Sequence, residues 1–235
     1  MTTQTCRDTC AIFTKPPPPR APGGEMMLTL LALIACVEDV AKDKIEAVVE
    51  EPPPVEQPAP AEPGEGAEVA GDPWIVNVEQ SKIEALGAKI TAKHPITFHD
   101  FEGKIHVADG KPTGVMFTVQ MKTLTSDNEK LTNHLLTPDF FDVEQFPTAE
   151  FRSTEITEGS DAEGMTHTIK GDFTIHGKTK RITFPARLEL GEGEVKASTE
   201  FALNRQDFGI TYPGKPDDLI QDNVVLTVEL VAPGA

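Results

Sequence analysis

The chain of 235 residues contains only three cysteines, and all of them lie within its first 36 residues, at Cys6, Cys10 and Cys36. The rest of the chain therefore has no disulfide framework and no thiolate metal site, because both require cysteine side chains. Polar aromatic residues are also rare, with one tyrosine and one tryptophan. The large side chains available for a core are mainly phenylalanine and aliphatic residues, which carry no polar group that needs a partner.

Basic residues are outnumbered, since 21 Lys and Arg stand against 38 Asp and Glu and give a formal net charge of −17. A charge of this sign repels the phosphates of nucleic acids and anionic membrane surfaces. Neither is therefore expected as an electrostatic partner. The charge is best explained by solubility.

Apolar runs long enough to cross a membrane are missing as well. The run Met26–Ala35 has ten residues, which is too short for a transmembrane helix and typical of the apolar region of a signal peptide. It is followed by Cys36, and Leu33-Ile34-Ala35-Cys36 resembles a bacterial lipobox, in which the cysteine is acylated and becomes the mature N-terminus. We therefore expect residues 1–35 to be an export signal and acylated Cys36 to attach the protein to a membrane. The expected location is the bacterial envelope, facing the periplasm, at the outer membrane.

Proline is concentrated before Trp74. Residues 36–72 are rich in Glu, Pro, Ala and Gly, a composition that does not form a packed core. We predict a disordered tether here, interrupted only by a brief helix over residues 40–49, where valine and isoleucine fall near helical spacing. The folded domain is then expected to span residues 73–235, which is long enough to enclose an apolar interior.

Apolar and polar residues alternate in several stretches of this domain, as they do in strands with one buried face. Turn signals such as Asp109-Gly110 and His176-Gly177 separate the stretches. Short strands joined by tight turns predict an all-β antiparallel meander, and closure into a barrel removes its exposed edges. The alternating stretches cover residues 115–121, 165–175, 182–190, 195–203 and 224–230.

One short helix is predicted to interrupt the meander. Ser126 and Glu129 have the spacing of a capping box, in which Ser126 is the N-cap. Leu131 and Leu135 fall on one face of the predicted helix, and Pro138 is expected to end it.

Several strings in the domain carry a resemblance to a known family. They are His134–Ser153 with its paired phenylalanines, Gly171–Lys180, Asn204–Ile210 and Asp217–Asp222. Together and in this order they resemble the YceI-like family, lipocalin-like periplasmic proteins described as polyisoprenoid binders, over about residues 74–232. The resemblance implies an antiparallel eight-stranded lipocalin-like barrel with one short helix inserted. It also implies non-catalytic binding of a long isoprenoid-type lipid, polyprenyl or quinone-like, inside the barrel.

The phenylalanines carry the functional prediction, because eleven of the twelve lie between Phe98 and Phe208. An eight-stranded barrel is just wide enough for side chains to fill it or for one slender ligand to occupy it. Periodicity alone favours a filled core, since most apolar faces are core. The resemblance favours a lipid cavity, whose candidate lining residues are Phe98, Phe101, Val115, Phe117, Val119, Phe140, Phe141, Phe151, Ile169, Phe173, Phe184, Phe201 and Phe208.

Two polar residues are candidates for contact with a lipid head group at the barrel mouth. Arg205 has a guanidinium that suits phosphate or quinone oxygens, but Asp207 stands two residues away, on the same side of an extended segment. A local ion pair between these two residues is therefore the favoured interpretation. His134, which belongs to the first motif, is expected either to cap the short helix or to reach the cavity mouth.

Catalytic and metal-binding patterns are scarce in the predicted domain. His94 and His99 are the closest pair of histidines, but a separation of five residues along a strand places them on opposite faces. No nucleophile–base motif occurs, so we expect no enzyme activity, no metal and no cofactor other than a bound isoprenoid lipid or quinone. The alternatives are a non-binding structural or stress-related envelope domain with a filled core and, less favoured, an enzyme acting on a bound quinone.

Overall fold

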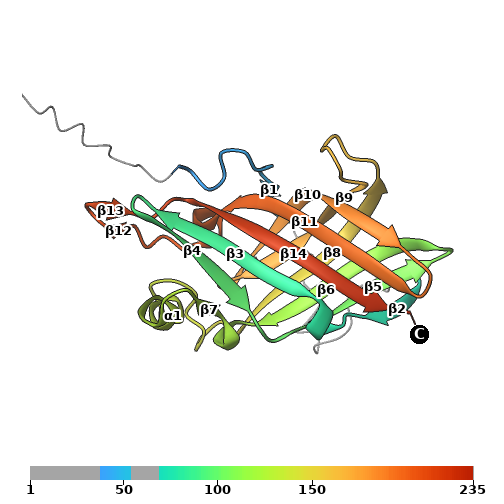
Figure 1. Ribbon diagram of the computed structural model, residues 1–235, viewed down its shortest axis with the longest axis horizontal. Helices are drawn as coiled ribbons and strands as arrows, with labels where there is room; N and C mark the ends of the chain where they lie inside the picture. The colour runs from blue at the N-terminus through green and yellow to red at the C-terminus, as the bar shows by residue number, and fades with distance from the viewer. Residues whose placement is uncertain (1–37, 54–68, 235) are drawn as a thin grey trace, which may run out of the picture. The chain divides into compact units, whose positions relative to one another are not determined.

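The computed structural model describes residues 38–53 and 69–234 (Figure 1). Its long strands, each of seven residues or more, are β3 Lys82–Lys89, β4 Ala92–Phe98, β5 Phe101–Ala108, β6 Lys111–Gln120, β8 Thr148–Glu158, β9 His167–Ile175, β10 Lys178–Leu190, β11 Glu194–Asn204 and β14 Asn223–Pro233. Its short strands are β1 Val48–Glu50, β2 Asp72–Ile75, β7 Thr125–Ser126, β12 Gly214–Lys215 and β13 Asp218–Leu219. Its helices are α1 Glu129–Leu135 and the 3-10 helices η1 Val78–Gln80, η2 Met121–Thr123 and η3 Arg205–Phe208.

Twelve of these strands form one sheet that curls around an apolar interior (Figure 1). Their order is β2-β5-β6-β8-β9-β10-β11-β14-β3-β4-β7, with β1 attached to β10, while β12 and β13 form a separate pair. The predicted all-β antiparallel fold with one inserted α-helix is confirmed for the described residues. The strand count differs from the eight that the resemblance implies, because the sheet contains nine long strands and the three short strands β1, β2 and β7.

Two-residue turns set the register of two long hairpins. Asp109-Gly110 joins β5 to β6, His176-Gly177 joins β9 to β10, and all four residues have positive φ. Turns of this kind match the twist of antiparallel strands, as the dipeptides predict. Glycine is required at Gly177 for a second reason, because a Cβ there would collide with the ring of Phe146.

The helix α1 begins later than the capping-box spacing suggests. Its N-cap is Asn128, whose side-chain oxygen accepts hydrogen bonds from the backbone N–H groups of Lys130 and Leu131. Ser126 belongs to β7, where it pairs with Ile96, and its hydroxyl donates to the backbone carbonyl of Asn128 at 3.0 Å. The prediction that Ser126 caps the helix is therefore wrong. Asparagine caps a helix as well as serine does, and Ser126 is held by the sheet.

One end of the barrel is bridged by the chain after β2 and contains almost fully buried side chains, and we call it the closed end. The backbone N–H of Val76 donates to Gly103 in β5, and that of Asn77 donates to Val231 in β14. The chain after β2 thus bridges two strands that are not neighbours in the sheet. The side chains enclosed at this end are each 2% exposed or less, and they are Ile105, Val195, Leu230 and Ala232.

The strands β10 and β11 separate partway along their length. β10 pairs with β11 only over Arg187–Leu190, although its pairing with β9 continues over Lys178–Ala186. The carbonyl oxygen of Pro185 accepts a hydrogen bond from the hydroxyl of Thr199 in β11, at 2.6 Å. The nitrogen of Pro185 faces the same way in an extended strand and has no hydrogen to donate, so the ladder ends there.

Residues 38–53, which we call the N-terminal strap, fill the resulting gap. β1 pairs antiparallel with residues 181–183 of β10, and Ala202 in β11 exchanges backbone hydrogen bonds with Ile45 and Ala47. Ala47 and Val49 pack against the core. The predicted disordered tether and the predicted brief helix are therefore wrong for the strap, because Pro185 leaves backbone groups open that an extended segment can satisfy. Of the rest of the predicted tether, residues 36–37 and 54–68 lie outside the described residues, and Asp72 already belongs to β2.

Candidate functional site

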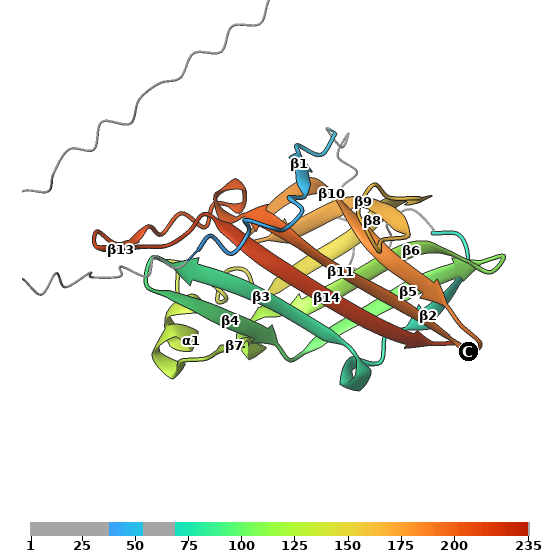
Figure 2. The same cartoon turned by 45° about the horizontal axis from the view of Figure 1, so that its top comes forward.

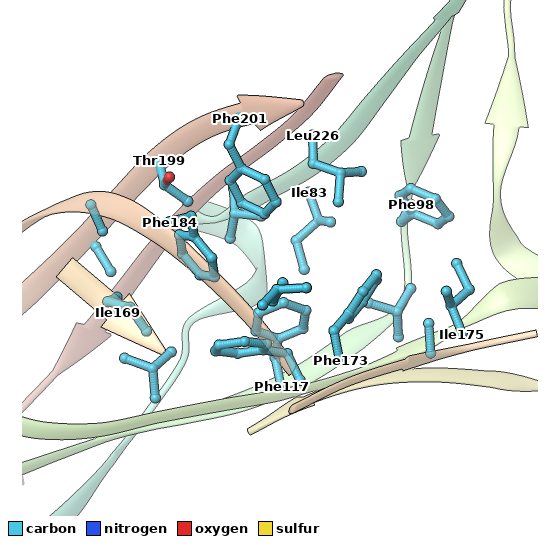
Figure 3. Close-up of a pocket in the computed structure, with 18 of the residues that line it drawn as sticks. Ile83, Phe98, Phe117, Ile169, Phe173, Ile175, Phe184, Thr199, Phe201 and Leu226 are labelled. Carbon is cyan, nitrogen blue, oxygen red and sulfur yellow. The ribbon is translucent and has the colours of Figure 1, made fainter. Parts of the chain in front are cut away.

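The interior of the barrel holds two adjoining cavities. The inner chamber has a volume of about 70 Å³ (Figure 3). The second cavity, which we call the mouth, has a volume of about 660 Å³ and lies at the end of the barrel that carries α1 and the β12–β13 pair. The two cavities adjoin, because four residues line both of them. These residues are Phe98, Phe173, Ile175 and Leu226.

Aromatic rings fill most of the barrel around the inner chamber. Phe117 stacks on Phe151 at a centroid distance of 5.5 Å, and Phe151 contacts Phe184 at 5.5 Å. Phe184 lies almost parallel to Phe201, at 4.4 Å (Figure 3). Ring pairs of this kind contribute about 0.5–1.5 kcal/mol beyond the burial of their area. The continuous series of rings explains why so little space remains in the chamber.

A glycine makes room for one of these rings. A Cβ at Gly171 would lie 2.5 Å from the ring of Phe151 and 2.6 Å from the carbonyl oxygen of Arg152. Any larger residue would therefore push Phe151 out of the series. This contact gives a packing reason for the glycine that opens the string Gly171–Lys180.

The inner chamber offers a ligand almost no polar group. Among its lining residues only Ser198 and Thr199 carry hydroxyls. The hydroxyl of Thr199 already donates to Pro185, as described above. Apart from Ser198 and the thioether of Met121, a molecule in the chamber would meet hydrocarbon alone, so the chamber suits an apolar group.

The mouth is bounded by strand ends and by α1 with the loop that follows it. His134, Phe140 and Tyr212 contact one another there at ring-centroid distances of 5.0 to 5.2 Å. The ring Nε2 of His134 forms a hydrogen bond with the carboxylate of Asp139, at 2.8 Å. Of the two predicted positions of His134, the structure therefore shows the one at the cavity mouth.

Arg205 lies at the mouth, but its guanidinium is used by the protein itself. It is 7% exposed and donates to the carbonyls of Gln221 and Ile210, at 3.0 and 2.6 Å, and to the carboxylate of Asp222, at 3.1 Å. Burial lowers the pKa of Arg205, and the charge of Asp222 partly opposes that shift. The predicted pair with Asp207 is wrong, because residues 205–208 form a 3-10 helix, in which side chains two residues apart point in different directions.

An ion pair holds the outer rim of the mouth together. The ammonium of Lys89 at the end of β3 lies 2.5 Å from the carboxylate of Asp218 in β13. The same carboxylate accepts hydrogen bonds from the backbone N–H and the hydroxyl of Thr91, at 3.2 and 2.9 Å. Hydrogen bonding by Lys89 is the main reason why the pKa of Asp218 is lowered. The pair therefore fastens the β3–β4 turn to the β12–β13 pair.

The structure brings most of the predicted cavity residues together. Those around the inner chamber are Phe98, Val115, Phe117, Val119, Phe151, Ile169, Phe173, Phe184 and Phe201. Those at the mouth are Phe140, Phe141 and Phe208, together with Phe98 and Phe173. Phe101 lines neither cavity and is buried in the core. Cys36 lies outside the described residues.

Sequence reasoning missed much of the mouth. Ala85 and Gly87 in β3 face it, and a Cβ at Gly87 would meet no atom within 4 Å. Tyr212 and Ile220 also line it, from irregular chain between η3 and β14. Small residues and irregular segments show no hydrophobic periodicity, so the only available signal was the weak alternation of Ile83, Ala85 and Gly87.

No group of three or more His, Cys, Asp or Glu side chains in the described ranges is placed to hold a metal ion. His94 and His99 have separate partners, the carboxylate of Asp127 at 3.0 Å and the hydroxyl of Thr125 at 2.8 Å. Within residues 38–53 and 69–234, no helix has the length and apolar character needed to span a bilayer.

Comparison with known sequences identifies the relatives of the chain. The model of the YceI-like domain matches residues 74–232. A UPF0312 protein of Pseudomonas putida KT2440 is 37% identical over 127 residues, which cover 50% of this chain and 64% of that protein. A UPF0312 protein of Photorhabdus laumondii is 33% identical over 100 residues, which cover 42% of this chain and 50% of that protein. The chain thus spans less than two thirds of the length of these curated relatives.

Comparison with solved structures shows the same fold. The crystal structure of Burkholderia cenocepacia BcnA matches with a TM-score of 0.60 and 21% identity, over 67% of this chain and 99% of that chain. A structure described as a polyisoprenoid binding domain from Saccharophagus degradans matches with a TM-score of 0.56 and 10% identity, over 69% of this chain and 98% of that chain. At these identities the likeness concerns the fold alone.

Proposed function

Because the chain belongs to the YceI-like family, we propose that its barrel binds a long apolar isoprenoid-type lipid, polyprenyl or quinone-like, without altering it. The observation that carries the proposal is the mouth of about 660 Å³, which adjoins an apolar chamber of about 70 Å³ and shares four lining residues with it. A structure with the same fold is described as a polyisoprenoid binding domain, which supports the same class of ligand.

The size of the mouth suits the apolar chain of such a lipid. Sites for small molecules have volumes of about 300–1,000 Å³, and the mouth lies within that range. Each Å² of apolar surface that the lipid buries there contributes about 25 cal/mol. The inner chamber as it stands accepts only the end of the chain, which then lies beyond Phe98 and Phe173.

The head group of the lipid stays at the rim of the mouth. A polar group in the inner chamber would lose its hydrogen bonds to water and find almost no partner there. Arg205 is already bonded to three protein groups, so its proposed role is to hold the wall of the mouth. The polar aromatic residues on the wall of the mouth are His94, His134 and Tyr212. Our proposal is that His134 and Tyr212, whose rings contact each other, meet the head group.

We further propose that Cys36 is acylated and anchors the domain in the bacterial envelope, facing the periplasm, at the outer membrane. The support is the string Leu33-Ile34-Ala35-Cys36 at the end of an apolar run. Cys36→Ser should abolish labelling by radioactive palmitate and move the protein from the membrane fraction to the soluble fraction. Labelling that persists in this variant would disprove acylation at Cys36.

A structural domain without a ligand is the second candidate. The observation in its favour is the nearly filled inner half of the barrel, where only about 70 Å³ remains. On this hypothesis the mouth holds water, and its apolar wall serves only the core. Lipid recovery separates the two candidates.

The test uses the Cys36→Ser protein, which is expected to be soluble, as the starting protein for all variants; it is purified without detergent from the native host and analysed by lipid mass spectrometry. Gly87→Phe adds a ring to open space in the mouth, so it should displace the lipid with little strain. We expect about a tenfold loss of bound lipid, equivalent to about 1.4 kcal/mol. Stability in urea should change by no more than about 0.5 kcal/mol, as for an unstrained surface change.

Gly191→Phe is the matched control. It adds the same ring to the β10–β11 turn, where the nearest atom to a new Cβ, the carbonyl oxygen of Glu194, lies at 3.7 Å. Lipid content should stay at the level of the starting protein. Absence of isoprenoid lipid from the starting protein itself would favour the structural domain.

A further inference from the structure

Two exposed apolar side chains lie side by side at the outer edge of the mouth. Ile90 in the β3–β4 turn is 43% exposed, and Leu219 in β13 is 47% exposed. The backbone N–H of Ile90 donates to the carbonyl of Leu219 at 3.1 Å, which keeps the two residues together. Isolated exposed apolar residues are ordinary, but this pair, which we call the lip, stands directly beside two lining residues of the mouth, Lys89 and Ile220.

Two lysines share the mouth with the lip. Lys130 in α1 and Lys215 in β12 both line the mouth, and neither has an ion-pair partner within the described residues. In the strand pairing of β12 with β13, the backbone of Lys215 lies opposite that of Asp218, which is the neighbour of Leu219. Long lysine side chains can lie along apolar surface and hold the ammonium at the level of lipid phosphates. In a chain with 38 acidic and 21 basic residues, this placement favours a phosphate-bearing surface.

The N-terminal strap starts at the same end of the barrel. Val40 is buried against Ala88 and Val225, and its backbone N–H donates to the side chain of Gln221 at 3.1 Å. Ala88 lines the mouth. Both views show the strap beginning beside the β3–β4 turn and β13 (Figures 1 and 2).

This starting point limits the reach of an anchor at Cys36. An extended chain covers at most about 3.6 Å per residue, so four residues span no more than about 14 Å. An anchor at Cys36 is therefore held close to Val40 and the mouth. The long tether predicted from composition does not separate them.

We infer that the mouth docks on a phospholipid bilayer, with the lip against the acyl chains, Lys130 and Lys215 at the phosphates, and the closed end pointing away. The net charge of −17 opposes the approach to an anionic surface, so the lip supplies the main attraction. One consequence rests on the proposed function. A lipid bound by the barrel passes directly from the bilayer into the mouth without crossing water.

The single tryptophan allows the orientation to be measured. Trp74 in β2 pairs with Ile105 at the closed end. The full chain with Cys6→Ser and Cys10→Ser is coupled through Cys36 to a maleimide lipid in vesicles of phosphatidylethanolamine and phosphatidylglycerol. The vesicles also contain phosphatidylcholine with brominated acyl chains, which quench indole fluorescence on contact. We expect no quenching of Trp74 and strong quenching of the indole in the Trp74→Phe/Ile90→Trp variant.

Leu219→Asp tests the lip itself. Added to the Ile90→Trp variant, it should reduce quenching by about twofold or more, because membrane attachment scales with the apolar area buried. Leu190→Asp is the matched control, since Leu190 is a 38% exposed apolar residue that pairs with Val195 at the closed end, and it should leave quenching unchanged. Equal quenching at positions 74 and 90, or stronger quenching at 74, would overturn the inference. Quenching at position 90 in a protein that yields no isoprenoid lipid would support docking and contradict the proposed function. Recovery of lipid from a protein that shows no quenching at position 90 would support the proposed function and contradict docking.

Discussion

The closed end and the mouth share strands, and one of these strands, β3, turns smaller side chains inward at the mouth. On β14 the inward residue is leucine at both places, since Leu230 is buried at the closed end and Leu226 faces both cavities. On β3, Ile83 fills space beside the inner chamber, whereas Ala85 and Gly87 leave the mouth open. The comparison shows that small inward side chains on β3 leave space for the mouth, whose wall is completed by α1 and by loops.

The two ends also differ in what stabilises them. The closed end is held by apolar burial and by the backbone bridge from Val76 and Asn77. The mouth has less apolar packing and relies on the hydrogen bonds of Arg205 and on the ion pair of Lys89 with Asp218. Substitutions of the same kind at the two ends should therefore have unequal effects.

The largest expected effect is at the closed end, where Leu230→Ala removes a side chain that is 2% exposed. The lost burial and the cavity left behind should lower the free energy of unfolding by about 2–5 kcal/mol. Leu226→Ala, the same change on the same strand, should cost about 1–2 kcal/mol, because Leu226 already borders open space. Urea denaturation measures both values. Equal losses would remove the energetic distinction between the two ends.

Arg205→Ala should have the next largest effect and show that one part of the mouth is firmly held. The substitution leaves the carbonyls of Gln221 and Ile210 and the carboxylate of Asp222 without their donor, which should cost about 2–4 kcal/mol. Asp207→Ala should cost less than about 0.5 kcal/mol, since Asp207 is exposed and does not pair with Arg205. A comparable loss of unfolding free energy in both variants would support the ion pair between Arg205 and Asp207 predicted from the sequence.

Val49→Asp tests the part of the barrel wall that the strap supplies beside β10. It places a carboxylate against the core and should cost about 1–3 kcal/mol. Val48→Asp should be nearly neutral, because Val48 is 57% exposed. Hydrogen exchange should become faster in β10 at residues 181–183 and stay slow at Ile105. Faster exchange at both places would mean that the two ends unfold as one unit.

The smallest expected effect concerns the rim and depends on pH. The pKa of Asp218 is lowered from 3.8, first by hydrogen bonding to Lys89, so the contribution of this carboxylate is complete above that value. It is lost as the pH falls through the lowered pKa, which lies below about 4. Exchange of the Thr91 amide, which donates to Asp218, should therefore be accelerated only in that acidic range. Asp218→Asn should remove this pH dependence, and its persistence in the variant would assign the effect to another group.

The alternating strands of the barrel could be predicted from the sequence because each buries one face. Residues such as Phe117, Phe173 and Phe201 follow a period of two, and the structure turns them all inward. The partners of Arg205 could not be predicted, since Gln221 and Asp222 lie 16 and 17 residues away, across irregular chain. The mouth escaped prediction for a related reason, because it is made by small side chains and by loops.

The strap shows the limit of compositional reasoning. Glutamate and proline around β1 favour extended chain, and β1 itself has only three residues. Its place in the sheet exists because Pro185, more than 130 residues later, interrupts the β10–β11 ladder. A segment of this composition is ordered by an opening elsewhere in the fold, and no local pattern reports that opening.

That opening bears on where the chain can be cut. The match to the YceI-like domain begins at residue 74, so a fragment trimmed to it would lack the strap. Thr183 and Ala202 would then lose their backbone partners, and two bare strand edges would face water. Bare edges recruit strands from other molecules. A fragment trimmed to the family boundary is therefore expected to self-associate more readily than the full chain. The residues that match the family do not include the strap, which covers these edges in the folded barrel.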